Sequence, residues 1–572
     1  MKRVAFHNLG CKVNSYEMEA MQQNLKEEGY YIVPFDEIAD IYIVNTCTVT
    51  NIADRKSRQM LHRAKQLNPA AVVVAVGCYV QTGRKTVEQD DSIDLAIGNN
   101  RKKDIVPILE EYLQRRQVWE QSAARQEEIK RPTEAGGQGE VQEGAERQAE
   151  IEGRAEVQEG AERQAEIEGR AEAQEGAERQ AEIEGRAEAQ EETGRQTETN
   201  GQTKKGAETE RQTEQGKTKQ IAMIDINGNC GYEEMQLKHT GEHTRACIKI
   251  QDGCNQFCSY CVIPYARGRV RSRRAEDIIK EIEGLVKEGC REVVLTGIHI
   301  SSYGIDFEEE AWKTGVSRRL LHGEQPQYTG SSKLVDLIER IHGLEGLERI
   351  RLGSLEPRII QEDTAERLAA MPKLCPHFHL SLQSGCDTTL KRMNRHYTTG
   401  EYYTSVNILR KFFSHPAITT DVIVGFPGET EEEFALTKEF LEKIRFYDMH
   451  IFKYSKREGT RAASMSCQVP EPVKAQRSGV LLELAASQSA EFRKRYIGRE
   501  AEVLPEEMRE IGGRIYKIGH TRDYVKVAVE SGGREAAEPA ADDIERVLVT
   551  GYLTDEILLA EKPRIHNVAL EF

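Results

Sequence analysis

The first part of the chain alternates strand-like apolar runs with amphipathic stretches. The apolar runs lie at residues 2–9, 41–45, 71–76 and 93–97. After the first run, Asn14 and Glu17 form a capping pair and Gly29 marks a stop, which predicts a helix between them. Strands that alternate with helices are typical of a parallel sheet. We therefore expect residues 1–119 to form an α/β domain with an open parallel sheet.

A second series of apolar runs, each followed by a helical stretch, begins at residue 245. The runs lie at residues 245–251, 292–297, 349–354, 377–382, 420–425 and 450–454. After the first of them, Ile278, Ile282 and Leu285 share one face of a predicted helix. Six strand–helix units predict a partial version of the eightfold barrel, whose active sites lie at the carboxyl ends of the strands. We assign this (β/α)6 barrel to residues 241–472.

The last part of the chain has shorter strands. Alternating apolar and polar residues at 496–563 predict a small β-barrel, which we assign to residues 490–565. No window holds about 18 consecutive apolar residues, so no membrane span is expected. The N-terminus lacks the apolar run of a signal peptide, which favours a cytoplasmic location.

A polar, repetitive segment separates the first two predicted domains. Residues 120–220 contain no Leu, Phe, Tyr, Trp, His, Met or Cys, and a Glu-rich repeat occurs at 144–159, 160–175 and 176–191. Each repeat holds too few aliphatic residues to offset the entropy cost of ordering. We therefore predict a disordered, acidic, low-complexity insert over residues 120–240.

This segment also changes the meaning of the net charge. The whole chain carries −16, which argues against a nucleic-acid partner because phosphate binding needs Lys and Arg. A net −11 of that charge lies within residues 120–220. The rest of the chain is nearly balanced, so the composition leaves an RNA partner open.

Three cysteines of the first domain occupy equivalent positions. Cys11, Cys47 and Cys78 each follow a predicted strand. The carboxyl ends of parallel strands meet at one edge of an open sheet, where ligands bind. The three thiols are therefore expected to converge on a metal site. The alternative is three buried structural thiols, because free cysteine is often buried.

Three further cysteines are closely spaced. Cys254, Cys258 and Cys261 form C-x3-C-x2-C after the first strand of the predicted barrel. Closely spaced thiolates hold iron–sulfur clusters, usually with four ligands. Three thiolates leave one iron open for a substrate or cofactor. The alternative is a zinc site completed by Cys247 or Cys290.

The chain resembles the radical S-adenosylmethionine methylthiotransferases in six motifs: NLGCKVNSYE, VNTCTVT, AVGCYVQ, IQDGCNQFCSYCVIPYARG, LQSGCDTTLKRMNRHYT and DVIVGFPGET. Within that family, the opening GCKVNSYE is most similar to the bacterial threonylcarbamoyladenosine tRNA methylthiotransferases. The resemblance covers nearly all of the chain outside the insert.

This resemblance implies two 4Fe–4S clusters, with S-adenosylmethionine as methyl donor and radical source. The C-x3-C-x2-C triad matches the cluster that binds S-adenosylmethionine through its open iron, where cleavage would yield a 5′-deoxyadenosyl radical that takes hydrogen from adenine C2. Cys11, Cys47 and Cys78 match the auxiliary cluster, which supplies sulfur. The implied product is the 2-methylthio derivative of N6-threonylcarbamoyladenosine beside the anticodon. The implied partners are a tRNA anticodon stem-loop, an electron donor and a sulfur source.

Two other functions stay open at this point. One is a methylthiotransferase that acts on isopentenyl-adenosine in tRNA or on an aspartate of a ribosomal protein. The other is an iron–sulfur electron carrier or an RNA-binding module without radical chemistry. An electron carrier should saturate each cluster with four cysteines, whereas both triads here number three.

Five residues at predicted strand ends are candidates to bind S-adenosylmethionine. Glu356, Ser381 and Gln383 offer polar groups, and Gly425 and Gly428 would let the backbone approach the adenine. The alternatives are ordinary hydrogen bonding at strand ends and a simple turn.

A row of arginines follows the second cysteine motif. On an extended chain, Arg267, Arg269, Arg271 and Arg273 would share one face, to which Arg274 adds, and this face could bind RNA phosphates. The alternative is a solvated charged strand.

By the same resemblance, residues 490–565 correspond to an RNA-binding TRAM domain. Tyr516 and Tyr524 are candidates to stack on bases there, with core packing as the alternative.

Overall fold

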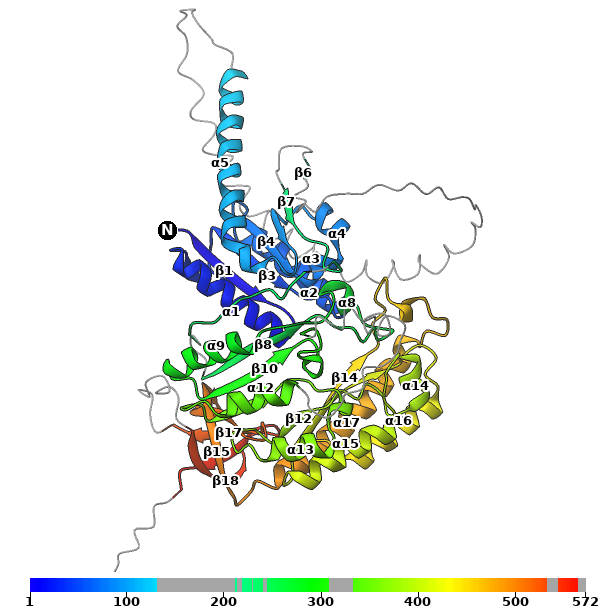
Figure 1. Ribbon diagram of the computed structural model, residues 1–572. Helices are drawn as coiled ribbons and strands as arrows, with labels where there is room; N and C mark the ends of the chain where they lie inside the picture. The colour runs from blue at the N-terminus through cyan, green and yellow to red at the C-terminus, as the bar shows by residue number, and fades with distance from the viewer. Residues whose placement is uncertain are drawn as a thin grey trace, which may run out of the picture. The chain divides into compact units, whose positions relative to one another are not determined.

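The computed structural model describes residues 1–130, 211–212, 219–228, 230–239, 244–307, 333–531 and 544–563 (Figure 1). The chain divides into two compact units, one of Met1–Arg116 with Ala207–Phe572 and one of Gln117–Gly206. The predicted disordered insert lies mostly outside the described residues. None of the described helices combines the length and the apolar character needed to cross a membrane.

The N-terminal domain is built on one seven-stranded sheet in the order β2-β1-β3-β4-β5-β7-β6. The strands are β1 (Arg3–Asn8), β2 (Tyr31–Val33), β3 (Ile41–Thr46), β4 (Val72–Gly77), β5 (Leu95–Ile97), β6 (Arg211–Gln212) and β7 (Lys219–Ala222). All neighbours are parallel except β6 and β7. The predicted parallel sheet is confirmed. Its helices are α1 (Lys12–Glu27), α2 (Asn51–Leu67), α3 (Cys78–Thr82), α4 (Arg84–Gln89), η1 (Lys102–Asp104) and α5 (Ile105–Lys130).

Two parts of this sheet differ from the prediction. The chain returns after the repetitive segment and adds β7 beside β5, and Met235 and Leu237 are buried in the core. The insert boundary at residue 240 is therefore wrong at its C-terminal end. The strands β2 and β7 were missed because each is short, and a short strand is defined by its partner rather than by its own pattern.

The central domain contains six parallel strands in two sheets, β11-β10-β8 and β12-β13-β14. A parallel bridge between Leu355 and Leu380 links the two sheets. The strands are β8 (Arg245–Asp252), β10 (Glu292–Gly297), β11 (Arg349–Leu352), β12 (His377–His379), β13 (Ala417–Val424) and β14 (Asp448–Lys453), and the short β9 (Arg271–Ser272) pairs antiparallel with β8. All six strands predicted for this domain are confirmed.

Helices follow the strands of this barrel (Figure 1). They are α8 (Ile263–Ala266), α9 (Ala275–Lys287), η2 (Ile300–Ser302), α12 (Lys333–His342), η3 (Pro357–Ile359), α13 (Glu362–Ala369), α14 (Asp387–Arg392), α15 (Thr399–Phe412), α16 (Glu431–Ile444), η4 (Arg461–Ser464) and α17 (Glu471–Lys494). Capping boxes start two of them, with Thr398 and Glu401 at α15 and Thr430 and Glu433 at α16.

The C-terminal strands close into a barrel in the order β15-β16-β17-β19-β18. They are β15 (Glu500–Ile511), β16 (Arg514–Thr521), β17 (Lys526–Glu530), β18 (Glu545–Tyr552) and β19 (Leu558–Glu561). The inward-facing Val503, Val527, Val547 and Leu558 are buried and fill the barrel. The sequence of this region predicts such short strands because alternate positions are apolar.

The N-terminal domain and the central barrel share one apolar core. Tyr16 and Met21 of α1 belong to the same buried cluster as Ile248 of β8 and Ile282 of α9. The buried residues of α1 therefore pack against both the N-terminal sheet and the central barrel. This packing holds Cys11 and Lys12, at the start of α1, against the barrel.

Candidate functional site

The C-x3-C-x2-C motif forms a loop directly after β8. The backbone N–H of Cys254 donates to the carbonyl oxygen of Gly268 (3.0 Å), and that of Cys261 donates to Cys258 (3.0 Å). Gly253 has φ +71°, and a Cβ there would lie 1.8 Å from the carbonyl oxygen of Arg269. The loop can fold back this tightly only with glycine at this position.

The three thiols of this loop are half-buried and near enough to affect one another's ionisation. Burial, together with the neighbouring Cys258, raises the pKa of Cys254 to about 12. The pKa of Cys261 is raised for the same reasons, burial first and then Cys258 and Cys254. Arg395 donates from Nη1 to Sγ of Cys258 (3.1 Å). Ionised thiolates so near one another would repel, and a bound cationic group would offset this repulsion. The site is therefore suited to a cationic metal group.

The N-terminal cysteines converge as expected. Cys11 is the N-cap residue of α1, so the prediction that Asn14 and Glu17 cap this helix is wrong; both lie inside the helix. Cys47 directly follows β3, and Cys78 opens α3 directly after β4. Burial raises the pKa of Cys47 to about 11, and the neighbouring Cys78 and Cys11 contribute to the increase. A Cβ on Gly10 would lie 3.2 Å from Sγ of Cys47, so Gly10 lets the loop of Cys11 approach it.

Neither triad is arranged for a single zinc ion. Zinc–sulfur bonds of ~2.3 Å keep the sulfurs of one site about 4 Å apart. Among the described residues, the three-donor group within 4.8 Å is His379, Asp421 and His450, which contains no cysteine. Cys247 lies within β8 and Cys290 just before β10, toward the amino ends of parallel strands, whereas the motif follows the carboxyl end of β8. Neither can complete a zinc site with the motif.

A buried charge network lies between the two triads. Arg267 donates from Nη1 to Oε1 of Glu17 (2.8 Å) and to Oδ1 of Asp252 (3.2 Å). Lys249 contacts the same two carboxylates, at 2.6 and 2.8 Å. Lys102 adds a third cation at 2.5 Å from Glu17, so the pKa of Glu17 is held well below its usual range despite burial. Asn99 donates from Nδ2 to Sγ of Cys78 (3.5 Å) and to the carbonyl oxygen of Ala266 (2.8 Å). These bonds connect Cys78 of the N-terminal triad to α8, which follows the C-x3-C-x2-C loop.

The arginine row does not form the predicted RNA-binding face. Arg267, Arg271 and Arg273 are buried, whereas Arg269 is half-buried and Arg274 is exposed. Arg273 lies 2.5 Å from Glu234, and Arg271 lies 3.6 Å from Asp252. The prediction of one shared accessible face is wrong because internal carboxylates, which come from distant parts of the sequence, neutralise these side chains. Arg269 and Arg274 alone keep an accessible charge.

The five candidates for S-adenosylmethionine binding follow β11, β12 and β13, at the same strand ends as the cysteine motif. Glu356 is buried and lies 2.5 Å from Nε of Arg358 and 3.6 Å from Nε2 of His299. Gln383 has φ +70°, and the Ser381 carbonyl accepts a hydrogen bond from Tyr397 (2.6 Å). The contact of Glu356, Ser381 and Gln383 with the cofactor stays a prediction.

The two glycines among these candidates have positive φ, +70° at Gly425 and +77° at Gly428. A Cβ on Gly425 would lie 2.3 Å from Cγ of Lys474, so the close approach of α17 requires glycine here. The turn is therefore explained by packing, and a role in binding adenine stays a prediction.

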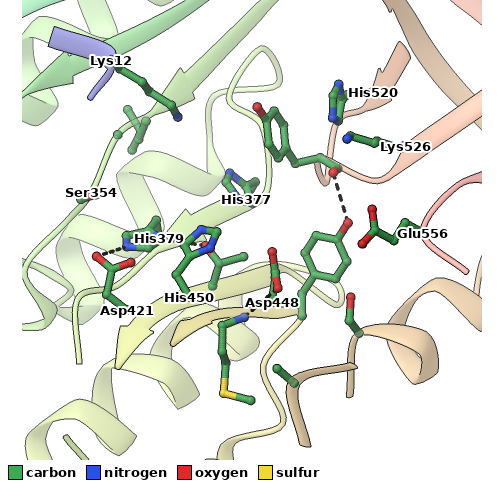
Figure 2. Close-up of a pocket in the computed structure, with 18 of the residues that line it drawn as sticks. Lys12, Ser354, His377, His379, Asp421, Asp448, His450, His520, Lys526 and Glu556 are labelled. Atoms are coloured by element: carbon green, nitrogen blue, oxygen red, sulfur yellow. Dashed lines mark hydrogen bonds and ion pairs between the residues drawn. The ribbon is translucent and has the colours of Figure 1, made fainter. Parts of the chain in front are cut away.

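A cavity of about 1800 Å³ is lined by residues of all three domains, and no sequence pattern predicted it. Its lining includes Cys11 and Lys12, strand residues of the central barrel, and His520, Tyr524 and Lys526 of the C-terminal barrel (Figure 2). Because Cys11 lines it, the N-terminal triad borders this cavity. Only the fold brings these residues together, since no two of the three groups are near each other in sequence.

Aromatic stacking closes part of the cavity. The ring of Tyr524 stacks on His520 (4.3 Å between centroids) and on His377 (5.1 Å). Burial lowers the pKa of His377 well below its usual range, and the neighbouring Arg351 and Lys12 lower it further. Tyr516 is buried in the C-terminal barrel. Of the two tyrosines considered for base stacking, Tyr516 packs in the core of the C-terminal barrel. The ring of Tyr524 already stacks on the rings of His377 and His520.

Comparison with known proteins agrees with this site. Residues 248–441 match the radical SAM superfamily, and residues 3–98 match the uncharacterized protein family UPF0004. The threonylcarbamoyladenosine tRNA methylthiotransferase MtaB of Bacillus subtilis (strain 168) is 33% identical over 534 residues, which is 92% of this chain and 90% of that protein. The chain belongs to the radical S-adenosylmethionine tRNA methylthiotransferases.

Other methylthiotransferases match over similar lengths. The MtaB protein of Aquifex aeolicus (strain VF5) is 32% identical, over 88% of this chain and 92% of that protein. The tRNA-2-methylthio-N(6)-dimethylallyladenosine synthase of Opitutus terrae is 31% identical, over 91% of this chain and 90% of that protein. The family is therefore clear, and two different modified adenosines occur among the names of these relatives.

Methylthiotransferases of this family use S-adenosylmethionine and carry two 4Fe–4S clusters. The residues present fit both clusters, because the three thiols of each site are near enough to affect one another's pKa, and among the described residues no fourth cysteine joins either set. Cys254, Cys258 and Cys261 would hold one cluster, and Cys11, Cys47 and Cys78 the other. The predictions of the enzyme class and of its cofactors are confirmed.

Proposed function

We propose that this methylthiotransferase acts on N6-threonylcarbamoyladenosine beside the anticodon of tRNA and forms its 2-methylthio derivative. The observation that carries the proposal is the cavity at Cys11, which is lined by Lys12, His379, Asp421 and His450. A polar and cationic lining suits a base that carries a carboxylate and a hydroxyl. A hydrocarbon substituent would leave those groups desolvated without partners.

The chain's own residues would prepare the reaction in two ways. When bound, S-adenosylmethionine and the two clusters supply the radical and sulfur chemistry, which no protein side chain provides. Arg395, at 3.1 Å from Cys258, and Arg267, beside Cys78, place positive charge next to the two thiolate sets. The shared core under α1 keeps the N-terminal domain, with Cys11, at the edge of the cavity.

Within this proposal, residues 1–119 with β7 hold the auxiliary cluster, residues 241–472 form the radical domain, and residues 490–565 are a TRAM-like domain that binds RNA. The anticodon stem-loop would approach the cavity past Arg269 and Arg274, the two arginines of the row that solvent reaches. An electron donor and a sulfur source complete the set of partners.

Reconstituted, reduced enzyme tests the proposal on two anticodon stem-loop RNAs, one with N6-threonylcarbamoyladenosine and one with N6-dimethylallyladenosine. Mass spectrometry of the digested RNA should show the 2-methylthio product with the first RNA and little with the second. Turnover of the dimethylallyl RNA alone would assign the chain to the other substrate. Loss of the 2-methylthio-threonylcarbamoyl nucleoside from a deletion strain provides the matching test in cells.

A further inference from the structure

Lys12 is a cation of the cavity without an ionic partner. Among the described residues, no carboxylate oxygen lies within 4.0 Å of its Nζ. Two cations near Lys12 are paired, Arg245 of the cavity lining with Glu506 (3.0 Å) and Arg351 with Glu292 (2.8 Å). Figure 2 shows the Lys12 side chain directed into the cavity. Lys12 is exposed to the cavity, and among the described residues no carboxylate contacts its ammonium, so this charge is available to an anionic group of a ligand.

The position of Lys12 relative to the chemistry is also informative. Lys12 follows Cys11, a residue of the auxiliary triad, and both line the cavity. In adenine, C2 and C6 are both bonded to N1, so a substituent on N6 begins beside the carbon that receives sulfur. A residue next to the sulfur-bearing site is therefore within reach of the N6 substituent of the same base.

The neighbouring wall of the cavity offers hydrogen-bonding groups for the rest of such a substituent. His379, Asp421 and His450 lie on the adjacent strands β12, β13 and β14 (Figure 2). Nε2 of His379 lies 3.3 Å from Oδ2 of Asp421, and the His379 and His450 rings stack at 5.9 Å. These side chains supply donors and an acceptor for a hydroxyl and a carbonyl group.

We propose that Lys12 binds the carboxylate of the threonylcarbamoyl substituent and is the residue that selects this base over adenosines with hydrocarbon substituents. The inference rests on the proposed function and names the contact that determines its specificity. Binding a hydrocarbon would bury the Lys12 ammonium without an anion, so the same residue attracts one base and rejects the other.

The test replaces the charge and keeps the length of the side chain, as Lys12→Met, with Lys26→Met as control. Lys26 lies on the same helix, is exposed and lines no part of the cavity. Three stem-loop RNAs are compared, with N6-threonylcarbamoyladenosine, its carboxyl methyl ester, and N6-dimethylallyladenosine. Iron content and the midpoint of thermal unfolding show whether each variant is folded and loaded with clusters.

For the carboxylate RNA, kcat/KM of Lys12→Met should fall about 10- to 100-fold, the usual loss for one hydrogen bond to a charged group. The methyl ester should lower kcat/KM of the unmodified enzyme by a similar factor. On the ester RNA, Lys12→Met and the unmodified enzyme should have the same kcat/KM. Lys12→Arg should recover part of the loss, and Lys26→Met should match the unmodified enzyme.

Two results would overturn the inference while leaving the proposed function intact. One is equal kcat/KM of Lys12→Met and the unmodified enzyme on the carboxylate RNA. The other is an equal loss for Lys12→Met on the ester and on the carboxylate RNA, which would show a role unrelated to the carboxylate. If the unmodified enzyme turns over only the dimethylallyl RNA, the proposed function fails first and the inference with it.

Discussion

The two cysteine triads reach the same number of thiols by different routes. Cys254, Cys258 and Cys261 lie within one loop, so local backbone geometry brings them together. Cys11, Cys47 and Cys78 come from three loops, and only the register of three parallel strands brings them together. The local triad can be recognised as a motif, whereas the second triad requires a correct view of the sheet. The comparison predicts that the two triads can be disabled separately.

Loss of the local triad should have the largest effect. Cys258→Ala removes one of three thiolates from the cluster that binds S-adenosylmethionine, so formation of 5′-deoxyadenosine should fall below detection. Iron should drop from about eight to about four atoms per chain, because the other triad is untouched. Chromatography of the nucleoside and an iron assay on anaerobically purified protein measure both. Cys467→Ala, at an exposed cysteine, is the control. Continued 5′-deoxyadenosine formation by Cys258→Ala would break the assignment.

Loss of the dispersed triad should separate the two steps. Cys47→Ala should still form 5′-deoxyadenosine but give no methylthio product, because the thiolate set that would supply sulfur is incomplete. Mass spectrometry of the RNA and of the small-molecule fraction of the same reaction provides the measurement. Methylthiolated RNA from this variant would contradict the role assigned to Cys11, Cys47 and Cys78.

The buried network between the triads should matter for stability. Arg267→Met leaves the carboxylates of Glu17 and Asp252 with one cation fewer, and breaking a buried pair costs about 3–5 kcal/mol. The midpoint of thermal unfolding should therefore fall clearly in Arg267→Met. The matched change Arg274→Met, at an exposed arginine, should leave it nearly unchanged. Equal midpoints for the two variants would contradict the buried arrangement.

The smallest effect concerns pH. Two residues after Glu17 on α1, burial raises the pKa of Glu19 to about 7. A carboxyl that binds its proton more tightly in the folded state than in the unfolded state, where its pKa is ~4.3, loses stability as the pH rises between those two values. Glu19→Gln should therefore raise the midpoint of thermal unfolding at pH 8 and change it little at pH 4. Unfolding curves of both proteins at the two values test this, and an equal shift at both would argue against it.

Much of the fold could be predicted because its patterns are local. The six barrel strands arise from apolar runs of neighbouring residues. The strands β2 and β7 could not be predicted, because three or four residues acquire their structure from a partner strand. The arginine row failed for a related reason. An alternating pattern places side chains on one face but does not say whether that face meets solvent or carboxylates.

The sequence by itself determined the parallel α/β architecture, the six cysteines and their division into two groups of three. Those features depend on apolar periodicity and on spacing along the chain, which short-range geometry converts into structure. Only the tertiary structure decided that Arg267 pairs with Glu17 and Asp252, and that Lys12, His379 and His520 line one cavity. Such contacts depend on which helix packs on which strand. The residues involved are hundreds of positions apart, so no local sequence pattern predicts that they meet.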